Sequence, residues 1–464
     1  MRGDGGLGGR RGGRRGLAVV SRQPVRTGLA PAVSPAVERG GISRWVARYS
    51  PWAIDPQWIS FGRLYFARVL GQCIGVGLTI LSARMLHPEG RGDFVAVSTG
   101  SALGVQALNL GLSSSLVVLF SRRALRVGRY RRHLVWLAVA WAALLMSVVA
   151  LALVFGHGVV AYWWPAWALW VPLQLLGLYQ GAALIALQDS KALVRIELTG
   201  RFAGLVLGTA ALMAFRSSVP PFLAAVVAAD ALVAVLGAIY LARVARGRVI
   251  RARRARPFFG AALRMGLRAY APLVLLFLLV KSDILVLRAL RGAAETGVYS
   301  VASQFVDFAL ILPTSIGALL LPSVVRAPRP TAEMLRVLRP AGLLTAGMAL
   351  GMLVFGHWAI VLLFGRAFEA AYPALLLLLP GFACLSLLSL IGQYFASRGF
   401  PFFLSSYWLL GFATNLSLNL LLIPRFGFMA AAASSSVAYA LVFGLLLRRF
   451  LQDWVREAAR GSAP

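Results

Sequence analysis

The stretch YPALLLLLPGFACLSLLSLIGQYFA, residues 372–396, contains no Asp, Glu, Lys or Arg. A helix of about 20 apolar residues is long enough to cross the hydrocarbon core of a bilayer. Segments of the same kind recur along the chain. The sequence therefore predicts an all-α polytopic membrane protein with about 12 transmembrane helices, near residues 64–86, 94–120, 133–156, 162–187, 200–216, 220–242, 268–290, 298–322, 341–364, 372–396, 402–423 and 427–449.

The composition supports the same class of protein. Hydrophobic residues make up 59% of the chain and charged residues 13%, which is outside the range of ordinary soluble domains. The net charge is +32 at pH 7. Basic residues beside membrane spans set topology and meet anionic lipid headgroups, so this charge needs no nucleic acid partner.

The orientation follows from where Lys and Arg fall, because short basic loops stay in the cytoplasm. The connections after the even-numbered spans, together with the C-terminal tail, hold 27 of them, and the odd-numbered connections hold 7. We therefore expect a multi-pass protein of the cell inner (plasma) membrane with both termini in the cytoplasm.

The spans divide the chain into six regions. The first is rich in Gly, Arg and Pro, with too few apolar side chains to offset the entropy of ordering. The second carries Trp45, Trp52 and Trp58, aromatic residues typical of a membrane interface. The expected regions are a disordered basic cytoplasmic tail (1–43), an interfacial aromatic segment (44–63), an N-terminal six-helix lobe (64–244), a basic cytoplasmic linker (245–266), a C-terminal six-helix lobe (267–450) and a cytoplasmic tail (451–464).

The sequence lacks the motifs of an enzyme or a metal site. The two cysteines, Cys73 and Cys384, fall inside predicted spans, and the four histidines are scattered. No HExxH, nucleophile-elbow or Walker motif occurs. We therefore expect no catalytic residues, no metal and no cofactor.

An internal repeat relates the two halves of the chain. Both copies read IL, two residues, R, one residue, L, and then, after five or six residues, G, one residue and an aromatic. Six spans per half give the two lobes the same orientation, related by an axis along the membrane normal. The alternative is chance similarity among Leu-rich helices. The matched residues are Ile80, Leu81, Arg84, Leu86, Gly92 and Phe94 in the first copy, and Ile284, Leu285, Arg288, Leu290, Gly297 and Tyr299 in the second.

Polar residues inside the spans recur three or four positions apart, which places each pair on one face of a helix. Such residues are costly in hydrocarbon and tend to face a cavity or a partner helix. We expect polar stripes that face a shared interior, with helix–helix hydrogen bonding as the alternative. The pairs are Arg68 with Gln72, Gln106 with Asn109, Gln304 with Asp307, and Asn415 with Asn419.

Charged residues inside the spans need partners on other helices. Lys281 and Asp283 are two positions apart, so they point to different sides of their helix. Asp307 or Asp230 is the expected partner of Lys281, and Arg68 the expected partner of Asp283. These residues either serve transport or form buried ion pairs that fix the register of the helices.

Three segments, at residues 80–97, 281–302 and 419–441, resemble the Wzx-type polysaccharide flippases of the multidrug/oligosaccharidyl-lipid/polysaccharide exporter superfamily. ILSARMLHPEGRGDFVAV (80–97) is similar to the end of their first span, and KSDILVLRALRGAAETGVYSVA (281–302) to their seventh-span signature. NLLLIPRFGFMAAAASSSVAYAL (419–441) resembles their junction of spans eleven and twelve. The resemblance runs from about residue 60 to residue 450.

This resemblance implies a central cavity that opens alternately to each side of the membrane. The implied cargo is an oligosaccharide linked to a polyprenyl (di)phosphate, moved from the cytoplasmic to the outer leaflet for cell-surface polysaccharide biosynthesis. Arginine suits bidentate contact with a diphosphate. The candidate headgroup residues are Arg68, Arg84, Arg201, Lys281 and Arg288; Arg84 and Arg288 could instead be snorkelling anchors.

The charges placed deep in the spans are balanced, whereas a diphosphate site should be strongly cationic. This balance leaves room for a carboxylate that carries a coupling proton or sodium ion. Asp283 is the first candidate, followed by Asp307 and Asp230. The candidate polar cavity residues are Gln72, Gln106, Asn109, Gln304, Asn415 and Asn419.

Other functions stay open. A cation-coupled multidrug exporter shares the expected fold. A membrane glycosyltransferase or polymerase usually needs a large outer loop with catalytic acids, and the outer connections here are short. A non-transporting assembly factor for the cell envelope is the remaining alternative. The expected partners are the lipid-linked glycan, the bilayer and polysaccharide assembly proteins.

Overall fold

The computed structural model describes residues 56–113, 115, 117, 141, 159–247, 258–327, 329–399 and 401–461. The expected tail (1–43), most of the third span (133–156) and the centre of the linker lie outside these residues, as do the side chains of residues 56–69. The described residues form helices joined by short turns. Eight of these helices are long and apolar enough to cross a membrane.

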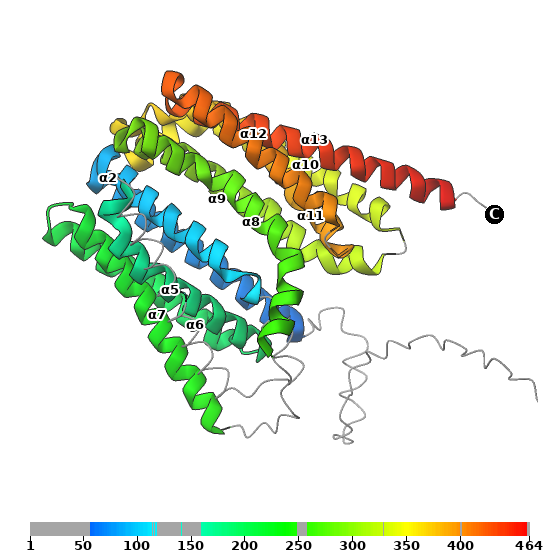
Figure 1. Cartoon of the computed structure of the whole chain (residues 1–464), viewed down its shortest axis with the longest axis horizontal. Coiled ribbons are helices and arrows are strands. Elements are labelled where there is room, and N and C mark those ends of the chain that lie inside the picture. The colour runs from blue at the N-terminus through cyan, green and yellow to red at the C-terminus, as the bar shows by residue number, and fades with distance from the viewer. Residues whose placement is uncertain are drawn as a thin grey trace, which may run out of the picture. The chain divides into compact units, whose positions relative to one another are not determined.

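The fold has the two lobes that the sequence predicts. The N-terminal lobe contains α2 (Pro56–Asn109), α5 (Val159–Ala186), α6 (Ser190–Ala214) and α7 (Val219–Gly247). Helix α6 packs against both α2 and α7, and α5 packs against α7 and α2. Figure 1 shows α5, α6 and α7 on one side of α2.

The C-terminal lobe follows in the order of the chain. Its elements are α8 (Phe258–Arg291), α9 (Ala293–Arg326), α10 (Pro330–Phe364), the short 3-10 turn η1 (Arg366–Phe368), α11 (Ala371–Ser397), α12 (Phe402–Phe426) and α13 (Phe428–Gly461). Helix α11 is central, because it packs against α9, α10 and α13. Its apolar sequence fits that position, and side chains such as Phe382 and Leu390 are fully buried.

Helix α2 comprises the first predicted span and part of the second, with a break at His87. His87 has φ 56° and ψ 178°, and Pro88 follows it. A residue before proline is disfavoured in helical conformation, so the chain turns here. The two arms of α2 meet α8 and α9, and this contact joins the two lobes.

Several helix ends differ from the predicted bounds. Helix α7 extends to Gly247 and α8 begins at Phe258, so helix occupies both ends of the expected linker (245–266). Helix α13 extends to Gly461, beyond the predicted end of the twelfth span. Hydropathy detects where a helix leaves the hydrocarbon, and a helix can continue into water. Asp453 stabilises this extension because it accepts hydrogen bonds from Tyr394 and Arg398, both at 3.3 Å.

Candidate functional site

A polar pocket lies inside the N-terminal lobe, among α2, α5, α6 and α7. Its volume is about 950 Å³. Small residues make room for it, including Gly71, Gly75, Gly177 and Gly204. Among the described residues, three charged side chains line the pocket, namely Glu197, Arg201 and Asp230, together with the amides of Gln72 and Gln174.

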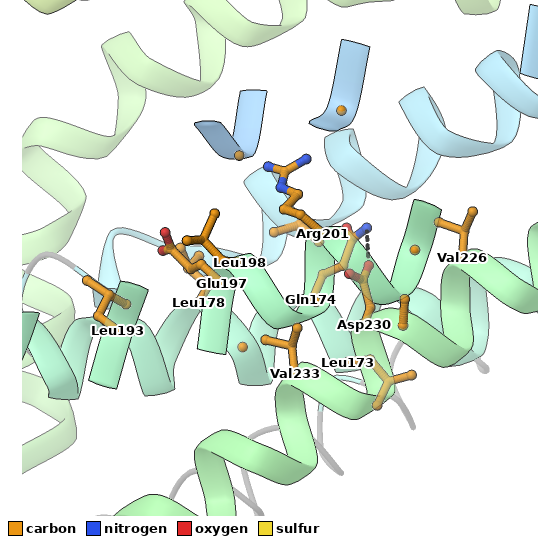
Figure 2. Close-up of a pocket in the computed structure, with 18 of the residues that line it drawn as sticks. Leu173, Gln174, Leu178, Leu193, Glu197, Leu198, Arg201, Val226, Asp230 and Val233 are labelled. Atoms are coloured by element: carbon orange, nitrogen blue, oxygen red, sulfur yellow. Dashed lines mark hydrogen bonds between the residues drawn. The ribbon is translucent and has the colours of Figure 1, made fainter. Parts of the chain in front are cut away.

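Asp230 is held by hydrogen bonds from α5. Its Oδ2 accepts from Trp170 Nε1 at 2.6 Å and from Gln174 Nε2 at 3.3 Å. Figure 2 shows the Gln174 contact within the pocket. Asp230 was one of two expected partners of Lys281, and the structure gives it these neutral donors instead. These two hydrogen bonds leave the Asp230 carboxylate with further acceptor positions, so it can still interact with a ligand in the pocket.

Arg201 contributes the positive charge of this pocket. Its side chain extends from α6 toward α2 (Figure 2), where a Cβ built on Gly75 would lie 3.6 Å from one of its terminal nitrogens. The side chain is exposed. Glu197 lies one turn earlier on the same helix and also lines the pocket. Among the described residues, the pocket therefore offers one guanidinium and two carboxylates to a ligand.

A second polar site, in the C-terminal lobe, is sealed. Asp283 on α8 is only 2% exposed, and Tyr299 on α9 and Ser435 on α13 donate hydrogen bonds to its Oδ2, the latter at 3.1 Å. The backbone N–H of Ile284 donates to Oδ1 at 2.8 Å. Arg68 is the expected partner of Asp283, and its side chain lies outside the described residues; among those described, two hydroxyl groups and one backbone N–H donate to Asp283.

Two predicted polar residues of α12 continue this site. Asn415 Nδ2 donates to Ser435 Oγ at 3.2 Å, and Asn419 Nδ2 donates to Asn415 Oδ1 at 2.8 Å. Both Asn side chains are fully buried. The series from Asn419 through Asn415 and Ser435 to Asp283 therefore forms a polar ladder that crosses three helices. It lies inside the lobe and lines none of the pockets described here.

A third polar site lies where the lobes meet. Lys281 Nζ is 2.6 Å from Asp307 Oδ2, so the structure confirms one of the two expected partners of Lys281. Gln304 lines the same pocket, which has a volume of about 270 Å³ and is bounded by α2, α8 and α9.

Arg91 also lines this pocket, and the sequence did not single it out. Its side chain is 3% exposed, and Nη1 donates to Ser82 Oγ at 2.9 Å. Its Nε has no partner among the described residues. Arg91 lies in the connection between the first two predicted spans, where burial lowers its pKa to about 10, so it remains protonated at neutral pH. A lone Arg in a predicted loop gives no signal of this burial.

Contacts between the lobes close one end of the molecule. Arg288 donates to Asp93 Oδ1 from Nε at 2.9 Å and from Nη2 at 2.7 Å. Arg84 donates to the carbonyls of Leu363, at 2.7 Å, and Leu362 in the last turn of α10, where carbonyls lack helical partners. The two repeat arginines thus bridge the lobes rather than face a described pocket.

The two repeat glycines lie at the same contact. A Cβ on Gly92 would be 1.8 Å from the Ala293 carbonyl oxygen, and one on Gly297 would be 1.9 Å from the Pro88 carbonyl oxygen. Real Cβ atoms do not approach this closely, so both positions require glycine. The repeat therefore encodes the close approach of the two lobes.

The remaining predicted residues fall elsewhere. Asn109 accepts a hydrogen bond from the backbone N–H of Ser113 at 3.2 Å, at the end of α2. The backbone carbonyl of Gln106 accepts a hydrogen bond from the Tyr270 hydroxyl, in a further contact between α2 and α8. The side chain of Arg68 lies outside the described residues. Among the described residues, the polar positions expected to share one interior thus lie in three places: the N-terminal pocket, the pocket between the lobes and the polar ladder.

Comparison with known proteins relates the fold to membrane transporters. A multidrug resistance MATE family transporter of the MOP superfamily, in an inward-facing conformation, matches with TM-score 0.67 and 13% identity over 84% of this chain and 96% of that one. Lipid II flippase MurJ, in an inward closed conformation, matches with TM-score 0.65 and 12% identity over 85% and 90%. No family model and no curated protein sequence matches the chain.

Proposed function

We propose that this protein is a membrane transporter that moves a polyprenyl-(di)phosphate-linked oligosaccharide from the cytoplasmic to the outer leaflet. One observation carries the proposal: a pocket of about 950 Å³ with charged and amide side chains lies inside a lobe of apolar helices. Placing charged side chains within membrane-spanning helices is costly unless they face a polar ligand, a water-filled cavity or one another. The shared fold with a lipid flippase supports a ligand that is partly lipid.

The contact between the lobes supports transport by alternating access. Asp93, Arg288 and the two repeat glycines close the end of the molecule that carries few basic residues. We assign that end to the outer face of the inner membrane, since short basic loops stay in the cytoplasm. Both termini are then cytoplasmic, and the protein would receive its lipid-linked substrate on that side.

Asp283 is our first candidate for coupling to an ion gradient, with Asp307 and Asp230 as alternatives. It is the most enclosed of the three carboxylates, and the polar ladder leads from it through Ser435 to Asn419. The Oδ1 of Asn419 is buried and has no partner among the described residues. A proton or sodium ion is small enough for such a site, whereas a saccharide is not.

The proposal is tested by reconstituting the full chain in liposomes that contain a radiolabelled prenyl-diphosphate disaccharide. Enzymatic accessibility of the sugar then reports which leaflet holds it. We expect flipping above the rate of protein-free liposomes, and loss of flipping in Asp230→Leu. Equal rates with and without the protein would contradict the proposal.

A cation-coupled multidrug exporter is the second candidate, since the described lining of the N-terminal pocket holds two carboxylates, Glu197 and Asp230, against one guanidinium, Arg201. Two negative charges favour an amphipathic cation. Efflux of a fluorescent organic cation from loaded cells would distinguish the two functions. The exporter is favoured if the wild-type protein exports the cation, if Asp230→Asn abolishes this efflux, and if the protein flips no sugar.

A further inference from the structure

The small pocket between the lobes carries an excess of positive charge. The charged residues that line it in the described structure are Arg91, Lys281 and Asp307. Lys281 is neutralised by Asp307 at 2.6 Å, and no carboxylate lies within ion-pair distance of Arg91 among the described residues. A buried guanidinium with an unpartnered Nε is costly unless an anion completes its hydrogen bonds.

The same pocket supplies further hydrogen-bond donors to an anion. Thr79 lies on α2, and Ser303 and Gln304 lie on α9, beside Asp307. The volume of about 270 Å³ suits a phosphate or diphosphate group but excludes an oligosaccharide together with it.

An apolar pocket adjoins this anion pocket. It has a volume of about 410 Å³ and lies among α8, α9, α11 and α12. Phe277 and Lys281 line both pockets, so the two are neighbours along α8. Most of its lining is Leu, Val, Phe and Trp, including Leu276, Leu385 and Trp408. An apolar pocket that begins at a lysine suits a hydrocarbon chain that ends in an anion.

We propose that these adjoining pockets form one binding site for a prenyl phosphate, with the phosphate between Arg91 and Lys281 and the hydrocarbon chain in the apolar pocket. This inference rests on the proposed function and deepens it, because it names the site of the lipid anchor. The saccharide then extends away from the anchor, and the N-terminal pocket is free to receive it.

Binding of short probes to the full chain in nanodiscs tests the site. The probes are farnesyl diphosphate, inorganic pyrophosphate as the anion alone, and farnesol as the chain alone. We expect farnesyl diphosphate to bind at least tenfold more tightly than either fragment. Preference for pyrophosphate would identify a free-anion site and overturn the assignment to a lipid, and equal binding of farnesol would overturn the anion site.

Charge variants give effects of opposite sign. Lys281→Gln and Arg91→Gln should each weaken farnesyl diphosphate binding about tenfold, the change that 1.4 kcal/mol produces. Asp307→Asn should tighten it by several fold, because it removes the only carboxylate among the described lining residues. Misfolding cannot mimic this tightening. An unchanged Kd in both Lys281→Gln and Asp307→Asn would overturn the proposal.

The chain pocket is tested separately at Gly392. A Cβ on Gly392 meets nothing within 4 Å, so Gly392→Leu should fold and fill the pocket. We expect it to weaken farnesyl diphosphate at least tenfold and to leave pyrophosphate unchanged. Gly351→Leu on α10, where a Cβ also meets nothing within 4 Å, is the matched control. An equal Kd for farnesyl diphosphate in the two variants would overturn the chain site.

The two proposals fail in distinguishable ways. Sugar flipping that persists in Gly392→Leu and Lys281→Gln would contradict this site and leave the flippase intact. Tight farnesyl diphosphate binding without sugar flipping would contradict the proposed flippase and leave the site intact.

Discussion

The two lobes carry carboxylates of the same kind in opposite surroundings. In the N-terminal lobe, Asp230 lines a pocket of about 950 Å³ beside Arg201. In the C-terminal lobe, Asp283 is 2% exposed and enclosed by Tyr299 and Ser435. A large ligand can reach the first carboxylate, and only a proton or a small ion can reach the second. From this difference we propose that the saccharide binds in the N-terminal pocket and that Asp283 serves coupling or structural support.

The largest expected effect concerns the enclosed carboxylate of the C-terminal lobe, Asp283. Asp283→Leu should destabilise the protein by about 3 kcal/mol, because it leaves the donors of Tyr299 and Ser435 buried without an acceptor. Asp283→Asn keeps one acceptor oxygen and should cost less. Thermal unfolding in detergent measures both variants. Equal stability of the wild type and Asp283→Leu would show that the ladder does not support the fold.

The next effect tests whether the two lobes must touch. Gly92→Ala places a Cβ 1.8 Å from the Ala293 carbonyl oxygen, so the closed end cannot form as described. We expect at least a tenfold loss of sugar flipping. Gly77→Ala, also on α2, is the control, since its Cβ meets nothing within 4 Å. Wild-type flipping in Gly92→Ala would contradict a role for this contact in transport.

For the N-terminal pocket, we expect substitutions to reduce transport without reducing the stability of the protein. Arg201→Gln and Asp230→Asn change charges in a pocket that a ligand reaches, so the free energy of unfolding should change by less than about 1 kcal/mol. Flipping should fall severalfold in each. A large drop in melting temperature in either variant would show that these pocket side chains support the fold, as the polar ladder at Asp283 does.

The smallest effect concerns the ion pair at the closed end. Asp93 and Arg288 are partly exposed, so Asp93→Asn should cost less than about 1 kcal/mol in stability. Flipping should still change, because the pair bridges the lobes. The swapped pair Asp93→Arg with Arg288→Asp should restore it toward wild type. No recovery in the double variant would argue against a direct role of the pair.

The sequence was sufficient to predict the described helices and some of their contacts. Long apolar runs are detected directly by hydropathy. The internal repeat contains Gly92 and Gly297, the two positions at which the lobes approach each other closely. The pairing of Asn415 with Asn419 followed from one helical turn. These features depend on local spacing or on equivalence between the halves.

Other contacts depend on packing that spacing does not encode. Trp170 and Asp230 come together only because α5 packs on α7. Arg91 occupies a predicted connection, and its burial arises because the kink at His87 folds that connection against α9. The sequence also predicts polar stripes that face one interior, whereas in the structure Gln72, Gln304 and Asn415 lie in three separate places.

The most direct test of the account is mass spectrometry of lipid-linked saccharides in cells depleted of this protein, with a surface-accessibility assay on any species that accumulates. We predict a prenyl-phosphate-linked saccharide that builds up on the cytoplasmic face and declines when the wild-type chain, but not Asp230→Leu, is restored. Unchanged lipid-linked saccharides and normal surface glycan after depletion would contradict the flippase.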